Sequence, residues 1–315
     1  MLPKLSIILP VFNAEKYVGK TIQCILEQSF QDFELLIADD GSTDNSRTIV
    51  DSFSDPRIIL SHNQLNLGKT STVNRLFRQA RGSYITIHDA DDFSAPNRFA
   101  KQINFLDKMP DLVMCGTSFM TIDCNENILE ENVMESDYEK IIQGISTKSQ
   151  FHGPTMLFRK SIADKLSDLY RAYFNDNYED TDLACRLLDY GPATNLPEKL
   201  YYYRILPNSL CRKEVNIRNR NLYKVVVFLR NQRIVNGLDC LMSGEPSTAD
   251  EYFESVTEPY KIDNSLINRE AAAYFLFWRM YSRAIRESLM AIKKQPSILK
   301  NWRTLFYCVR KSILR

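Results

Sequence analysis

Residues 5–46 read LSIILPVFNAEKYVGKTIQCILEQSFQDFELLIADDGSTDNS and hold two short apolar runs with a helical pattern between them. The runs at 5–11 and 33–38 have the length and composition of buried strands. Between them, Val18, Ile22 and Ile25 recur at the spacing of one helix face. A strand, a helix and a second strand in this order predict two parallel strands joined by a crossover helix.

The same alternation continues through the first half of the chain. Further strands are predicted from apolar runs at 57–60, 84–87 and 112–120, and further helices from patterns at 49–53, 76–80 and 99–106. The predicted fold class is therefore α/β, with a mostly parallel sheet flanked by helices. After about residue 205 the pattern is helical alone, with helices predicted at 222–235, 266–292 and 298–313. We expect two domains, residues 1–212 and 213–315.

The composition excludes several classes of protein. A chain of 315 residues that is 44% hydrophobic can bury a large core, which excludes a disordered or fibrous protein. The net charge of +1 gives no support for a nucleic-acid binder, because phosphate binding needs a basic surplus. The charge is uneven, however, since residues 269–315 contain 11 Lys or Arg and 2 Asp or Glu, a net of +9.

The cysteines and the hydropathy pattern indicate the compartment. The seven cysteines are scattered without a C-x-x-C pair, which fits neither a disulfide framework nor a zinc site. No apolar stretch approaches the roughly 20 residues of a membrane-spanning helix, and no signal-peptide pattern is present. We expect a protein of the reducing cytoplasm.

Polar residues follow three of the predicted strands directly. These residues are Phe12-Asn13, Asp39-Asp40-Gly41-Ser42 and Asp89-Ala90-Asp91-Asp92. In an open parallel sheet the ligand crevice lies beyond the carboxyl ends of the strands. The three segments are therefore candidate binding loops, although Asp, Gly, Ser and Asn are also ordinary turn residues.

Asp89, Asp91 and Asp92 place three carboxylates within four residues. Such a cluster repels itself unless a cation is bound. Oxygen ligands suit Mg²⁺ or Mn²⁺, and these ions commonly bind substrate phosphates, so a metal-bound diphosphate is the simplest partner. The alternative is an acidic turn that caps the helix beginning near Pro96.

A second acidic cluster, Glu179-Asp180-Thr181-Asp182, opens another helical pattern. Acids in a first helical turn are stabilised by the helix dipole, so capping alone could explain them. A carboxylate near a metal-bound diphosphate could instead accept a proton from an attacking hydroxyl.

These motifs, taken in order, resemble the family 2 inverting glycosyltransferases of the GT-A fold. The resemblance covers about residues 4–212 and includes the opening segment, Asn66-x-Gly68, Asn74, Ala80-x-Gly82-x-Tyr84 and DADD at 89–92. It continues through Gly153-Pro154-Thr155, NYEDTDLACRL at 177–187 and Tyr203-Arg204. A GT-A sheet has a Rossmann-like nucleotide-binding half, which agrees with the predicted fold class.

The resemblance implies a role for each matching residue. Pro10 and Phe12 would line the nucleotide base, with Asn13 and Glu15 in the same loop; Asp40 would read the base edge, with Asp39 beside it. Asp91 and Asp92 would hold Mn²⁺ or Mg²⁺ on the diphosphate, with Asp89 nearer the ribose and sugar. Asp180 would be the general base, with Glu179 beside it, whereas Asp182 is interpreted as a structural acid of the first helical turn.

The implied activity is single-displacement transfer of a sugar from a nucleotide-sugar, most simply a UDP-sugar, to a hydroxyl of a glycan or lipid-linked acceptor. Other nucleotide-dependent transferases form an alternative, although no glycine-rich basic phosphate loop is present near the N-terminus. A non-catalytic sugar-nucleotide-binding scaffold is another, supported by two departures from the family pattern. Leu206 stands where many relatives have His, and Val73 stands where relatives often have Arg.

Two further residues bear on those departures. His152 could take the place of the missing histidine as a metal or phosphate ligand. Lys69 could contact a phosphate, although a lone lysine is more simply interpreted as a solvated charge.

The basic C-terminal end contains an amphipathic pattern. Leu299, Trp302, Phe306 and Val309 lie at helical spacing among several Lys and Arg residues. Such a helix can lie on an anionic membrane surface, here the inner face of the cell membrane. The alternative is a helix whose apolar face packs on the catalytic domain.

Overall fold

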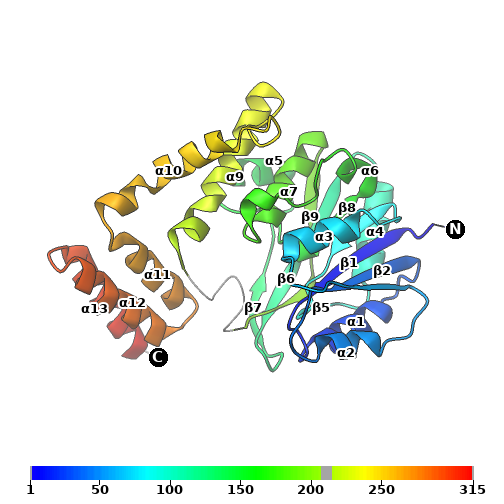
Figure 1. The fold of residues 1–315 in the computed structure, drawn as a ribbon, viewed down its shortest axis with the longest axis horizontal. Helices are drawn as coiled ribbons and strands as arrows, with labels where there is room; N and C mark the ends of the chain where they lie inside the picture. The colour runs from blue at the N-terminus through cyan, green and yellow to red at the C-terminus, as the bar shows by residue number, and fades with distance from the viewer. Residues whose placement is uncertain (1, 207–214, 314–315) are drawn as a thin grey trace. The chain divides into compact units, whose positions relative to one another are not determined.

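The computed structural model describes residues 2–206 and 215–313 (Figure 1). The chain divides into two compact units, residues 1–207 and 208–315. The predicted domain boundary, between residues 212 and 213, lies outside the described residues. The two units are described separately below.

The first unit is built on one mixed sheet in the order β3-β2-β1-β4-β8-β6-β9-β5, with β7 paired to β6 (Figure 1). Its strands are β1 (Leu5–Val11), β2 (Phe33–Asp39), β3 (Ile58–His62), β4 (Tyr84–Ile87), β5 (Phe93–Ser94), β6 (Met114–Ile122), β7 (Ile128–Asn132), β8 (Leu157–Arg159) and β9 (Ala193–Arg204). β3, β2, β1 and β4 are parallel neighbours, as are β6 and β9. β8 joins these two parallel groups by pairing antiparallel to both β4 and β6.

Helices cover both faces of this sheet. They are α1 (Val18–Leu26), α2 (Ser46–Asp51), α3 (Lys69–Phe77), α4 (Arg98–Lys108), α5 (Tyr138–Gly144), α6 (Lys160–Ala163) and α7 (Glu179–Leu187). Alternate residues of β1, from Leu5 to Val11, join α1 and α4 in one buried apolar cluster. Ile8 points to the opposite face, where α3 contacts β1 and β2. Burial of both faces explains the continuous apolar runs that predicted these strands.

The α/β fold predicted from the sequence is confirmed. The five predicted strands correspond to β1, β2, β3, β4 and β6, and the predicted helices of the first half correspond to α1–α4. The short β5 and β8, the exposed β7 and the long β9 were not predicted. All four make antiparallel pairs in the second half of the sheet.

The second unit is helical, as predicted, but its helices divide differently. It consists of α9 (Ile217–Asn236), α10 (Pro246–Ile262), α11 (Leu266–Phe277), α12 (Tyr281–Lys294) and α13 (Leu299–Ile313). The single helix predicted over 266–292 is wrong, because a turn with Arg279 at a φ of 56° separates α11 from α12. α10 was not predicted. A core of Ala271, Ala272, Phe275, Ala284 and Cys308 holds α11, α12 and α13 together.

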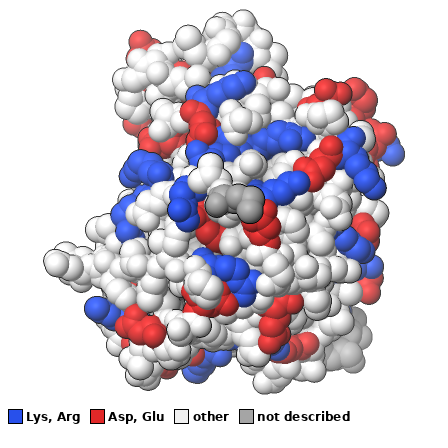
Figure 2. Space-filling view, turned by 90° about the vertical axis from the view of Figure 1, so that its right-hand side faces the viewer, with Lys and Arg blue, Asp and Glu red and all other residues white. Residues whose placement is uncertain are grey.

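Two properties of the described chain bear on its surroundings. Acidic and basic side chains are interspersed over the face of the molecule that Figure 2 shows. Among the helices described within residues 2–206 and 215–313, none is long and apolar enough to cross a membrane.

Candidate active site

The three predicted binding loops begin at one edge of the sheet. β1 ends at Val11, which lies opposite the last residue of β2, Asp39, while Ile87 at the end of β4 lies opposite Ile8. The parallel register therefore brings the segments after β1, β2 and β4 to a common edge, as the sequence predicts.

The loop after β1 is fastened to the loop after β2. Asn13 adopts a φ of 49°, and its Oδ1 accepts a hydrogen bond from Thr43 N at 2.8 Å. Glu15 Oε2 accepts hydrogen bonds from Asn45 N at 3.0 Å and Asn45 Nδ2 at 2.9 Å. Asn13 and Glu15 thus fix the shape of the loops, and their donor-binding roles stay predictions.

Phe12 and Pro10 lie beside this junction. The Phe12 side chain is 45% exposed, which leaves its ring accessible for stacking. Pro10 is half-buried within β1, opposite Ala38 of β2. Their assignment to the nucleotide base stays a prediction.

Asp40 is buried where β2 ends, and Asp39 is buried beside it. Asp40 Oδ1 accepts hydrogen bonds from Asn63 Nδ2 at 2.6 Å and Leu67 N at 3.0 Å. Gly41 follows with a φ of 71°, and a Cβ there would lie 2.7 Å from the carbonyl carbon of Leu65. Glycine is therefore required for the close approach of these two loops. Sequence reasoning missed Asn63, although it directly follows β3 as the other loops follow their strands.

Hydrogen bonds from α1 and from β9 hold the loop 89–92 in place. Thr21 Oγ1 donates to the carbonyl oxygens of Ala90 at 2.9 Å and Asp92 at 2.7 Å. Asp92 accepts from Tyr201 Oη at 2.8 Å and from Arg204 N at 2.6 Å. Burial, together with the charges of Asp91 and Asp89, raises the pKa of Asp92 well above its usual value.

Asp91 differs from Asp92 because no other described residue donates a hydrogen bond to its carboxylate. Burial and the charge of Asp89 raise the pKa of Asp91 to about 6. A bound cation would relieve both effects, so the donor chemistry fits Mg²⁺ or Mn²⁺. Within the described residues, no group of three or more His, Cys, Asp or Glu forms a ready metal site. The remaining ligands would come from a diphosphate and water. The roles of Asp91 and Asp92 as metal ligands stay predictions. Asp91 fits this role better than Asp92, because the Asp92 carboxylate already accepts two hydrogen bonds.

Lys69, at the start of α3, is the residue whose environment differs most from expectation. It is not a solvated charge, because its Nζ lies 2.8 Å from Asp89 Oδ1 in an ion pair that is about three-quarters buried. Burial lowers the pKa of Lys69, but the negative charges around it prevail and raise it well above the usual value. Asp89 has the largest of these effects, and Tyr170 and, from α7, Glu179 add to it. The partners are distant in sequence, so no local pattern could reveal the pair.

The second acidic cluster lies close to the same lysine. Burial raises the pKa of Glu179 to about 7 and raises that of Asp180 as well, while the charge of Lys69 lowers both. The charge of Lys69 therefore acts on Glu179 and Asp180 as well as on Asp89, with which it forms the ion pair.

Two features position Asp180. Its Oδ1 accepts a hydrogen bond from Thr181 N at 2.7 Å. A Cβ on Gly153, in the Gly-Pro-Thr segment, would overlap Asp180 Oδ2. Asp182 is buried and pairs with Arg186 Nε at 2.7 Å, in agreement with its interpretation as a structural acid.

Asp176 joins the two sides of the site and was missed by sequence reasoning. Its carboxylate accepts hydrogen bonds from Lys69 N at 3.1 Å and Thr70 N at 2.7 Å, so it caps α3 from the loop that leads into α7. Asn175, Asp176 and Tyr178 in that loop all have positive φ values. The hydrogen bonds of Asp176 thus tie the loop that leads into α7 to the beginning of α3.

The charge of Asp89 acts on His152 as well. Its ring stacks on Phe119 with centroids 4.0 Å apart, and its buried Nε2 has no hydrogen-bond partner among the described residues. Burial lowers the pKa of His152 to about 4, so the ring is neutral at pH 7. Leu206, where relatives have His, is half-buried just after β9. That His152 replaces the missing histidine stays a prediction.

Comparisons with known proteins identify the family of the chain. The model of the family described as "Glycosyl transferase family 2" matches residues 6–167. The O-antigen biosynthesis glycosyltransferase WbnJ of Escherichia coli is 30% identical over 255 residues, covering 76% of this chain and 95% of WbnJ.

Solved structures show the same fold. S. aureus TarS 1-349, in complex with UDP-GlcNAc, superposes with a TM-score of 0.61 at 17% identity, covering 98% of this chain and 88% of TarS. The mannosyltransferase PcManGT from Pyrobaculum calidifontis, in complex with GDP-Man and Mn²⁺, gives a TM-score of 0.55 at 17% identity and covers 99% and 88%. The resemblance noted in the sequence is thereby confirmed: the chain belongs to glycosyl transferase family 2 and is a glycosyltransferase.

Proposed function

We propose that the chain transfers a sugar from a UDP-sugar to an acceptor hydroxyl with inversion at the anomeric carbon. The observation that carries this proposal is that Lys69 pairs with Asp89 at 2.8 Å, while Asp176, in the loop that leads into α7, accepts hydrogen bonds from Lys69 N and Thr70 N. These contacts support a site in which the loop 89–92 binds the donor and the start of α7 supplies the base, with the charge of Lys69 acting on both.

In the proposed reaction, Asp180 accepts the proton of the acceptor hydroxyl. The acceptor oxygen forms a bond to the anomeric carbon from the face opposite the nucleotide. The bond between that carbon and the diphosphate oxygen breaks, and its electron pair leaves with the nucleoside diphosphate. Burial supports Asp180 in this role, because it raises the pKa of the carboxylate and makes it a stronger base. The charge of Lys69 lowers the pKa of the same carboxylate and so favours its ionised form.

Asp91 is the residue proposed to hold a divalent cation, with Asp92 supporting the loop and supplying a second carboxylate. When bound, Mn²⁺ or Mg²⁺ would offset the negative charge of the departing diphosphate. Phe12 and Asp40 would hold the nucleotide base at the ends of β1 and β2.

The donor and acceptor classes rest on similarity. TarS is solved with UDP-GlcNAc, which supports a UDP-linked donor here. WbnJ is named for O-antigen biosynthesis, which supports a growing glycan or lipid-linked oligosaccharide as the acceptor. Among the described cysteines, Cys24, Cys115, Cys124 and Cys308 are free thiols, which supports a reducing compartment. We therefore propose that the chain acts at the cytoplasmic face of a membrane and contacts it through its basic C-terminal helices.

The direct test is a screen of UDP-sugars with purified protein and Mn²⁺, measuring hydrolysis and transfer to short glycan acceptors. Asp180→Asn should lower kcat by about 10³-fold while metal-dependent UDP binding persists. The exposed carboxylate of Glu198, which pairs with Lys101 at 3.2 Å, provides the control Glu198→Gln, which should leave kcat unchanged. Unaltered turnover in Asp180→Asn would overturn the assignment of the base.

A further inference from the structure

The outer face of α13 is apolar. Leu299, Trp302, Phe306 and Ile313 follow one helical stripe and are 69%, 50%, 69% and 73% exposed, respectively. The buried positions of the same helix are instead Asn301 and Cys308. A surface helix normally turns its apolar stripe toward the core, so this one has the reverse orientation.

Cations border that stripe. α13 carries Lys300, Arg303, Arg310 and Lys311 and contains no acidic residue. An exposed apolar stripe with Lys and Arg beside it and an aromatic residue in it is the pattern of a helix that lies in a membrane interface.

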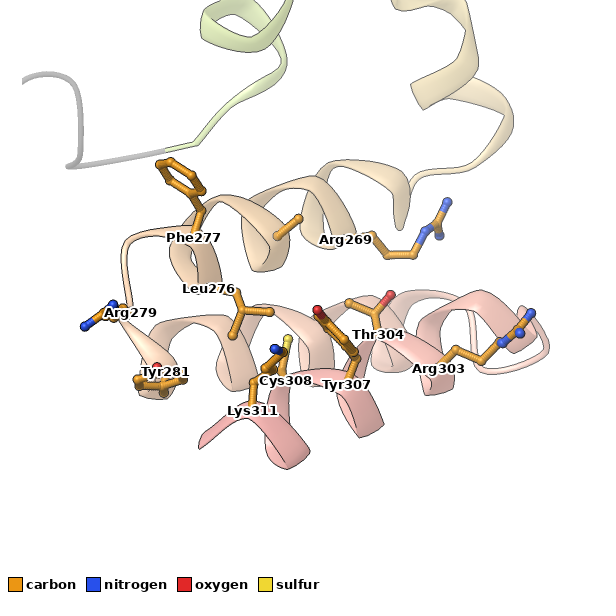
Figure 3. A pocket seen from close by; sticks show the side chains of 11 residues that line it. Arg269, Leu276, Phe277, Arg279, Tyr281, Arg303, Thr304, Tyr307, Cys308 and Lys311 are labelled. Atoms are coloured by element: carbon orange, nitrogen blue, oxygen red, sulfur yellow. The ribbon is translucent and has the colours of Figure 1, made fainter. Parts of the chain in front are cut away.

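A cavity of about 640 Å³ opens between α11, the start of α12 and α13 (Figure 3). Four cations, Arg269, Arg279, Arg303 and Lys311, contribute to its lining, and no Asp or Glu is among the lining residues. In Figure 3, Arg279 and Arg303 lie at opposite ends of the cavity. A second hollow of about 370 Å³ shares Arg303 and Tyr307 with the first and extends the groove along α13.

The cations of the groove differ in availability. Arg269 is neutralised by Asp263 at 2.6 Å and donates to Asn301 Oδ1 at 2.7 Å. By contrast, neither Arg279 nor Arg303 has an acidic partner within the described residues, and Lys311 Nζ lies 5.8 Å from the centroid of the Tyr307 ring. Unpaired cations on an exposed apolar surface favour an anionic, amphipathic partner.

We propose that this groove and the outer face of α13 together bind the surface of a bilayer that contains anionic phospholipids. The lipid phosphates would lie along the groove between Arg279 and Arg303, and the stripe from Leu299 to Ile313 would enter the interface. An anionic lipid surface supplies both the negative charges and the apolar layer that the two parts require. The groove and the outer face of α13 would form the membrane contact that is part of the proposed function. Its test measures vesicle binding, so its failure would leave the proposed transfer reaction intact.

The first experiment is flotation of the full chain with vesicles of phosphatidylcholine, with and without phosphatidylglycerol. Binding should require phosphatidylglycerol and weaken as salt is added. The double variant Arg279→Gln/Arg303→Gln should bind about 30-fold more weakly, since each basic residue near an anionic surface contributes about fivefold to the affinity.

The matched control is Arg286→Gln/Lys293→Gln. It removes the same charge from exposed positions of α12 that do not line the groove. Its binding should fall by less than about threefold. Equal losses in the two double variants, or equal binding to both kinds of vesicle, would overturn the groove as the binding site.

A second experiment tests the apolar stripe. The chain has two tryptophans, so Trp278→Phe leaves Trp302 as its only indole. The fluorescence of Trp302 in this variant should shift to the blue when anionic vesicles are added. Adding Phe306→Asp to the same variant should abolish the shift, while UDP binding in the first unit persists. Titration with inorganic phosphate separates the two sources of the anion. Saturable phosphate binding without vesicle binding would indicate a site for a soluble anion and would overturn the proposal.

Discussion

Lys69 Nζ lies 2.8 Å from Asp89 Oδ1, and the same ammonium group lowers the pKa of Asp180 on the other side of the site. Removing this charge should therefore raise the pKa of both Glu179 and Asp180, because a buried carboxylate is harder to ionise without a cation nearby. In Lys69→Met, the acid limb of kcat/KM should move to higher pH, since the base stays protonated over a wider range. Lys165→Met, at an exposed position, should leave the profile unchanged. An unmoved profile in Lys69→Met would show that Lys69 does not act on the base.

Asp91 should be responsible for a loss of metal binding in acid. Its pKa is raised to about 6, so the carboxylate becomes protonated as the pH falls through that value. Mn²⁺-dependent UDP binding should weaken below about pH 6, and Asp91→Asn should remove most of it at pH 7.

Asp91→Asn should also stabilise the protein without metal. An acid whose pKa is higher in the folded than in the unfolded state destabilises the fold above the unfolded pKa. Neutralising it should raise the free energy of unfolding at pH 7 by about 1–3 kcal/mol. Thermal unfolding with and without Mn²⁺ measures both effects. A variant that is less stable than the parent without metal would contradict the burial argument.

Gly153→Ala should damage catalysis more than folding. The new Cβ would overlap Asp180 Oδ2, so the base must move. A displacement of this kind should lower kcat by about 10²-fold while UDP binding is kept. Gly19→Ala is the control, because its Cβ would lie 3.5 Å from Ile49 Cγ2, an ordinary contact. It should be neutral or slightly stabilising in its helix. If the two variants had equal activity, Asp180 would not depend on the space at Gly153.

Asp176→Ala should weaken both the fold and the reaction. It removes the acceptor for the backbone amides of Lys69 and Thr70, which should cost about 1 kcal/mol in the free energy of unfolding. Loosening α7 from α3 should also lower kcat. Asp176→Asn keeps a side-chain oxygen and tolerates the positive φ, so it should restore most of the stability. Chemical denaturation of the three proteins compares them directly, and equal stability of all three would exclude the capping role.

The extent to which the sequence predicts the fold differs between the two halves of the sheet. β1 and β2 are decided locally, because burial on both faces leaves a continuous apolar run that few other structures accommodate. β7, by contrast, reads ILEEN and is almost wholly exposed, so nothing in its own composition indicates a strand. β7 forms because it pairs with β6, so tertiary contacts and not the β-propensity of its own residues stabilise it.

The site shows the same limit. Asp89, Asp91 and Asp180 could be named from their clusters and from the family resemblance. The contacts that position these acids could not be predicted, because the partners are far apart in sequence. Lys69 is 20 residues from Asp89, and Tyr201 is 109 residues from Asp92. Asp176 is 107 residues from Lys69, whose backbone amide it accepts a hydrogen bond from. Partners this far apart in sequence meet only once the sheet has formed.

The pairing of Asp92 with β9 sets a minimum length for any working fragment. The family match ends at residue 167, but Tyr201 Oη and Arg204 N, which hold the Asp92 carboxylate, come from the last strand of the first unit. A truncated protein that stops before Arg204 would leave that buried acid without its partners and open the sheet beside β6. Expression plasmids, deletion series and chimeras of this enzyme should therefore keep residues 2–206 as one indivisible module.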